Sequence, residues 1–161
     1  LHHRTDEVFH AAPEFVRLCT KWSAELEGRG LPWGASRAVA HVGTELLLDG
    51  FLLDDVATRA AYLRAIEALT APIASVIRVH GRGASRWPSL VERVLAHGAP
   101  DFYRDPALVA DRLVLILAPR PRLAIDDAHR PMLRDAMRAL RADVESATTA
   151  LTLAARAAAH A

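Results

Sequence analysis

The sequence contains a single cysteine, Cys19, so no intramolecular disulfide can form and the fold does not depend on an oxidising compartment. No apolar run approaches the roughly 20 residues that a membrane-spanning helix requires. The longest uninterrupted run, Leu113 to Ala118, has the length of a core segment. No signal-peptide pattern is present at the N-terminus. These absences predict a cytoplasmic protein without a membrane partner.

The sequence also lacks an excess of charge. Its formal net charge is +1, and Lys21 is its only lysine. A dedicated nucleic-acid binder is expected to be strongly basic, so we expect no nucleic-acid partner. Hydrophobic residues make up 52% of the chain and charged residues 24%, a balance that argues against wholesale disorder. The length of 161 residues fits one domain with its own core.

No segment shows the strict alternation of a half-buried strand, whereas alanine, leucine and arginine favour helix. We therefore predict an all-α fold: a single-domain bundle of six to seven helices over residues 1–161. Because Leu1 is not an initiator methionine, we expect a natural N-terminal helix to be missing. Capping residues and prolines place the expected helix starts. These starts are Leu1, Pro13, Ser36, Asp54 or Asp55, Ser85 or Trp87, Asp105-Pro106, and 126–131, with a kink at Pro72.

Two rows of metal-ligand residue types recur at a spacing of four residues, which places neighbours on one face of a helix. The first row is His2, Asp6 and His10, and the second is His41, Glu45 and Asp49. The second row lies in a mostly apolar segment, where a buried carboxylate needs a partner. A divalent cation shared by the two rows is one such partner.

A second interpretation stays open for both rows. Histidine and acidic residues four apart on a helix are commonly solvated, or form local hydrogen bonds and ion pairs. Three arginines, one beside the first row and two flanking Pro121, are candidate clamps for phosphate, because the guanidinium matches phosphate geometry. They are Arg4, Arg120 and Arg122, and ion pairs with nearby acidic residues are the alternative for each. Cys19 lies among apolar residues and is interpreted as part of the core.

Three segments resemble the acyl-carrier-protein phosphodiesterase family. His2, Arg4, Asp6 and Pro13 fall in register with that family's N-terminal signature. In the third predicted helix, His41 and Glu45 occupy the places of two acidic residues of the family. The segment from Leu117 to Leu123 is similar to the turn that precedes the family's last long helix. The three segments occur in the family's order.

The resemblance implies an HD-domain-like fold and a metal-dependent phosphodiesterase. It implies manganese, iron, magnesium or zinc as the cofactor, held by His2, Asp6, His41 and Glu45. It further implies that Asp49 or His10 moves a proton or orients a water, and that Arg4, Arg120 or Arg122 balances phosphate charge. The implied partner is a phosphoester substrate, free or linked to a carrier protein. The family has an acid at the position of His10 and a histidine at that of Leu46.

The leading hypothesis is thus a divalent-metal-dependent hydrolase acting on a phosphoester. A second hypothesis is a non-catalytic helical protein in which the two rows form an internal polar network. A third is a helical module that binds an apolar ligand, with Trp22, Trp33 or Phe51 around the cavity.

Overall fold

A computed structural model describes residues 2–68 and 87–160, with side chains described except at positions 2–5, 87, 90 and 158–160. Every regular element in these ranges is helical, which confirms the all-α prediction. In the same ranges, no helix combines the length and apolar character needed to cross a membrane. The α-helices are α1 (His2–His10), α2 (Pro13–Gly28), α3 (Trp33–Leu52), α4 (Val56–Ala68), α6 (Trp87–His97), α7 (Pro106–Leu117) and α8 (Arg130–His160). Short 3₁₀ turns, η2 (Asp101–Arg104) and η3 (Asp127–His129), precede α7 and α8.

Several helix starts follow from the capping rules. Pro13 occupies the first turn of α2, where its missing N–H costs nothing. Asp55 accepts a hydrogen bond from the backbone N–H of Thr58 at 2.8 Å, so it caps α4. Asp105 likewise accepts from the backbone N–H of Ala107 at 2.8 Å before α7. Gly98, with φ of +63°, ends α6 as expected for a helix C-terminus. The predicted kink at Pro72 lies outside the described residues.

The prediction that Ser36 caps the third helix is wrong. Helix α3 already begins at Trp33, directly after Pro32. The backbone N–H of Ser36 bonds to the carbonyl of Pro32 at 2.8 Å, so Ser36 lies inside the first turn. Its buried hydroxyl donates to the carbonyl of Leu31 at 3.0 Å. A side chain that bonds back to an upstream carbonyl stabilises the turn before the helix without acting as a cap.

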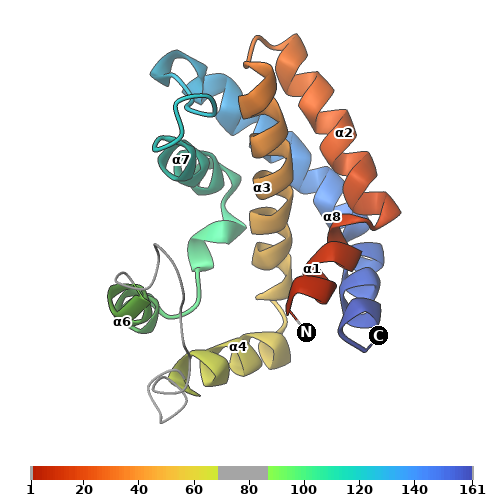
Figure 1. Cartoon of the computed structure of the whole chain (residues 1–161), viewed down its shortest axis with the longest axis vertical. Coiled ribbons are helices and arrows are strands. Elements are labelled where there is room, and N and C mark those ends of the chain that lie inside the picture. Colours follow the sequence, from red (N-terminus) through yellow and green to blue (C-terminus); the bar gives the residue numbers. More distant parts are fainter. Residues whose placement is uncertain (1, 69–86, 161) are drawn as a thin grey trace. The chain divides into compact units, whose positions relative to one another are not determined.

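The described chain divides into two compact units. The first, Leu1–Phe51 with Phe102–Ala161, contains α1, α2, α3, α7 and α8. In this unit α8 packs against α1, α2 and α7 (Figure 1). Its core is built from fully buried aliphatic side chains on four helices, including Leu26, Leu47, Leu113 and Leu140. The second unit, Leu52–Asp101, contains α4 and α6 and buries Leu53, Ile66 and Ala99.

Glycines allow α3 to approach its neighbours in the first unit closely. A Cβ added at Gly43 would lie 3.1 Å from the sulfur of Met137 on α8. A Cβ added at Gly50 would lie 2.5 Å from the carbonyl oxygen of Tyr103 in η2. The second contact is with backbone, which cannot move away as a flexible side chain can. Gly50 therefore permits the packing of the C-terminal part of α3 on η2.

We predict that Gly50→Ala destabilises the protein by about 1–3 kcal/mol, the usual cost of overpacking. Gly28→Ala is the matched control, because a Cβ added there meets nothing within 4 Å. That control gains helix propensity and should keep or raise stability. Chemical denaturation of both variants measures the two effects. Equal stability of both variants would contradict the close approach at Gly50.

Candidate metal centre

Three metal-ligand side chains from two helices converge in the first unit. His10 is the last residue of α1, and His41 and Glu45 lie one turn apart on α3. The Nε2 atom of His10 lies 2.7 Å from Oε1 of Glu45, and the Nε2 atom of His41 lies 3.4 Å from the same oxygen. One ligand atom from each residue falls within 4.8 Å of the others. Two imidazoles and one carboxylate thus face a common point.

Aromatic packing orients the two imidazoles. The ring of Phe15, which is buried near the start of α2, meets the ring of His41 edge-on at a centroid distance of 5.1 Å. The same ring lies 5.0 Å from the ring of His10, and the two imidazoles are 4.6 Å apart. One side of the centre is therefore apolar, while His10, His41 and Glu45 each keep part of their surface open to solvent.

In the first predicted row, His10 and Asp6 take positions in the site that differ from those the resemblance implied. His10, assigned there to proton transfer, lies in the donor cluster. Asp6, assigned there as a ligand, lies behind it, with Oδ2 3.6 Å from Nδ1 of His10. A carboxylate hydrogen-bonded to the far nitrogen of a ligating imidazole fixes the tautomer and orientation of the ring, and Asp6 lies just beyond that distance. The side chains of His2 and Arg4 lie outside the described residues.

The second predicted row holds together as expected, because its members share one face of α3. Asp49 lies one turn beyond Glu45 and is exposed to solvent. The protein around its carboxyl group and then the negative charge of Glu45 raise the pKa of Asp49 above its usual range. A carboxyl group of raised pKa beside the cluster is suited to accept a proton near neutral pH.

Electrostatic coupling within the cluster is strong. The interactions of His41 with the side chains of Cys19 and then Glu45 raise the pKa of His41 from 6.5 to about 10. Burial alone would raise the pKa of Glu45, but hydrogen bonds with His41 and His10 outweigh it and lower that pKa. In the metal-free protein, Glu45 is therefore ionised, and its carboxylate interacts with the imidazoles of His10 and His41.

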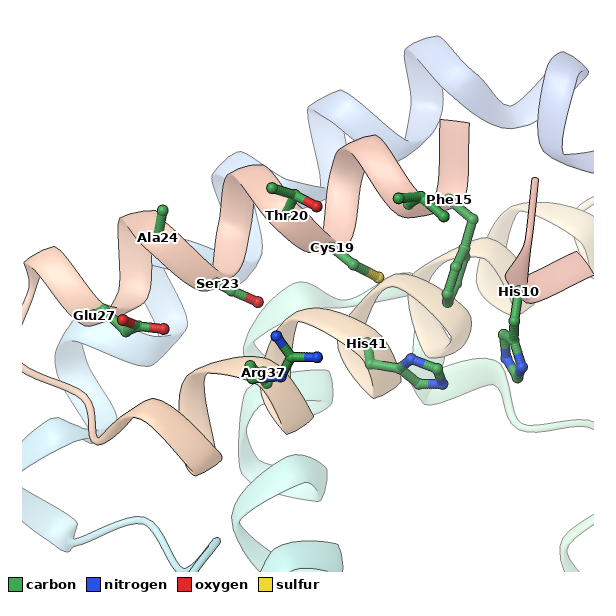
Figure 2. Close-up of a pocket in the computed structure, with 10 residues that line it drawn as sticks. His10, Phe15, Cys19, Thr20, Ser23, Ala24, Glu27, Arg37 and His41 are labelled. Carbon is green, nitrogen blue, oxygen red and sulfur yellow. The ribbon is translucent and has the colours of Figure 1, made fainter. Parts of the chain in front are cut away.

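A pocket of about 390 Å³ opens beside the cluster, between α2 and α3 (Figure 2). His10 and His41 line one part of it, and Arg37 lines another. The size is at the lower end of the range for small-molecule sites. Cys19, expected in the core, is half-buried and lies on the pocket wall. Cys19 and Arg37 are two of the lining residues that the sequence analysis did not assign to the site.

Other predicted residues lie away from this pocket. Arg120 and Arg122 are exposed in the segment between α7 and α8 and do not line it. Trp22 is buried and donates its indole N–H to Asp143 at 2.7 Å, while Trp33 is 67% exposed. Neither of these tryptophans lines the pocket. The pocket is instead lined by a mixture of charged, polar and apolar side chains.

The donor set fits a divalent metal ion with a small adjustment. Two histidines and one glutamate are a ligand set of catalytic zinc sites, and two histidines with a carboxylate also suit iron. Tetrahedral zinc with bonds of 2.0–2.1 Å separates its ligand atoms by about 3.4 Å. The distance from His41 to Glu45 already has this value. The distance from His10 to Glu45 must widen by about 0.7 Å from its hydrogen-bonded 2.7 Å.

Comparisons of this chain with models of protein families, with curated proteins and with solved structures find no match.

We predict that the purified protein binds about one equivalent of zinc or manganese and that its melting temperature rises with the metal. A ligand that binds only the folded state adds about 2.7 kcal/mol at 100 times its Kd. His41→Ala and Glu45→Gln should each remove this stabilisation, and a chelator should reverse it. His97→Ala is the control, because His97 is an exposed histidine on α6, outside the cluster, whose Nδ1 lies 2.7 Å from the carbonyl oxygen of Arg93. An unchanged melting temperature with metal would contradict the centre.

We also predict that metal binding tightens as pH rises from 6 to 9. Below pH 10, His41 is protonated in the metal-free protein, and its proton must leave before the imidazole can bind a metal. That proton alone makes the apparent affinity rise about tenfold per pH unit. Cys19→Ala removes the largest cause of the raised pKa, so it should strengthen binding at pH 7. Calorimetry in buffers of different ionisation heat counts the released proton, and a pH-independent affinity would contradict the prediction.

Proposed function

We propose that this protein is a divalent-metal-dependent hydrolase acting on a phosphoester. The observation that carries the proposal is the convergence of His10, His41 and Glu45, because the two histidines of this cluster line a solvent-open pocket. Structural metal sites are closed by four protein ligands, whereas catalytic sites use three and keep a position open. Three donors beside a pocket therefore favour a catalytic centre.

The residues around the cluster have distinct roles in this proposal. His10, His41 and Glu45 hold the cation, and Asp6 lies behind His10, where a small movement would let it accept a hydrogen bond from Nδ1. When bound, the cation supplies Lewis-acid chemistry, polarising a phosphoryl oxygen and making a water more acidic. Asp49 is the general base, because its raised pKa and its place one turn from Glu45 suit it to take up a proton.

The pocket limits the size of the substrate. A volume of about 390 Å³ admits a small molecule or the end of a flexible arm, but no folded domain. A substrate attached to a carrier protein would thus have to enter by its arm alone. Manganese, iron, magnesium and zinc all remain candidates for the cation, with the two imidazoles favouring the transition metals.

The test is hydrolysis of bis(p-nitrophenyl) phosphate by the metal-loaded protein. His41→Ala and Glu45→Gln should abolish hydrolysis together with metal binding. Asp49→Asn should keep the metal and lose about 10²–10⁴-fold in kcat, the usual contribution of a general base. Arg112→Gln, an exposed change on α7 outside the pocket, should hydrolyse the substrate like the unaltered protein. Stoichiometric metal without hydrolysis of this or simpler phosphoesters would contradict the proposal.

A second candidate function is a non-catalytic helical protein with an internal polar network. The hydrogen bond of 2.7 Å between His10 and Glu45 favours it, because the cluster satisfies itself without a cation. On this alternative, Glu45→Gln lowers the free energy of unfolding in metal-free buffer, and a chelator leaves the melting temperature of the unaltered protein unmoved. The metal titration described above separates the two functions.

A further inference from the structure

Arg37 is an uncompensated positive charge on the pocket wall. It lies on α3, is exposed to solvent and forms no ion pair with any residue of the described ranges. Its guanidinium lies over the exposed ring of Trp33, 5.0 Å from the ring centroid. Stacking on an indole restricts the side chain while leaving the planar fork of N–H donors free for a ligand.

The position of Arg37 relates it to the metal centre. It precedes His41 by one helical turn, which corresponds to about 6 Å along α3. Figure 2 shows both residues along α3, opposite the face of α2 that carries Cys19 and Ser23. The acidic residue on the pocket wall is Glu27 of α2, which makes no ion pair with Arg37. The positive charge is therefore available to a ligand that reaches from the metal centre along α3.

We infer that Arg37 forms a subsite for a second anionic group of the substrate, spaced a few atoms from the phosphate bound at the metal centre. This inference rests on the proposed function. The geometry that supports it is the stacked, unpaired guanidinium in the same pocket as His10 and His41, one turn from the metal ligands. The substrate class is a small phosphoester that carries a carboxylate or a second phosphate.

The subsite narrows the candidate substrates in a way the metal centre alone does not. A cation held by two histidines and one carboxylate recognises the phosphoryl group whatever is attached to it. A guanidinium fork adds a preference for oxyanions, because two parallel N–H donors match two anionic oxygens. A bis-anionic substrate is therefore favoured over a simple alkyl phosphate of the same length.

The experiment compares three non-hydrolysable ligands that share a two-carbon skeleton. Ethylphosphonate has one anionic group, 3-phosphonopropionate adds a carboxylate, and ethane-1,2-bisphosphonate adds a second phosphonate. Their affinities for the zinc-loaded protein are measured by calorimetry. Protection of Cys19, the sole cysteine, from alkylation reports independently that the ligand occupies the pocket.

We expect at least one of the bis-anionic ligands to bind about tenfold more tightly than ethylphosphonate, as a charge-assisted bond predicts. In Arg37→Gln this preference should fall to within about twofold, while zinc affinity stays unchanged and shows that the variant is folded. Arg37→Lys should keep part of the preference. Arg112→Gln, an exposed change outside the pocket, should keep all of it. The better of the two ligands distinguishes a carboxylate from a phosphate subsite.

Four results would overturn the inference. A preference that survives in Arg37→Gln, or the absence of any preference in the zinc-loaded protein, would refute the subsite alone. Ligands that bind without protecting Cys19 would place the anion outside the pocket. A protein that binds no metal would instead refute the proposed function, and the subsite with it.

Discussion

The candidate site depends on one contact, the hydrogen bond between His10 and Glu45. Helix α1 has only nine residues, too few to be stable by itself in water, so tertiary contacts hold it in place. The chain turns sharply after His10, and Pro13 starts α2 three residues later. That turn brings Phe15 under both imidazoles. The same contact thus fixes the end of α1 and completes the set of three donors.

The polar network and the metal site are two states of the same residues. Glu45 is followed along α3 by the buried side chains of Leu46 and Leu47, and its charge has to be compensated. Without a cation, a proton on His41 and the hydrogen bond with His10 provide that compensation. Cys19 and then Glu45 raise the pKa of His41 and so keep that proton in place. A divalent cation would replace the proton and bring more charge to the same point. The raised pKa of His41 therefore opposes metal binding, because a proton must leave first. It also shows that positive charge is stabilised at this point of the site.

The sequence predicted the local parts of this structure better than the assembly. Proline and aspartate at helix starts have direct physical effects, so the caps of α4 and α7 could be recognised. Ser36 misled because its hydroxyl bonds to a carbonyl upstream instead of an N–H downstream. The spacing of His41 and Glu45 placed both on one face. Which member of the first row would reach them depended on the rotation of α1 about its axis, which spacing alone does not determine.

Two of the residues that the sequence analysis did not assign to the site continue patterns that were visible. Arg37 extends the row of His41, Glu45 and Asp49 by one more step of four residues. On α2, the pocket-lining residues Phe15, Cys19, Ser23 and Glu27 follow the same step. Two such rows on consecutive helices were the sequence signal that could have indicated this pocket.

The relative direction of the row on α2 and the row on α3 explains why the pocket has two different ends. A connection of four residues, 29–32, joins α2 to α3, and helices joined so briefly pack antiparallel. The rows therefore run in opposite directions, so Glu27 and Arg37 lie near the connection, whereas Phe15 faces the imidazoles. This pair of helices forms most of the pocket from contiguous sequence. Among the described lining residues, only His10 comes from outside this pair, so the packing of α1 decides whether two donors or three are present.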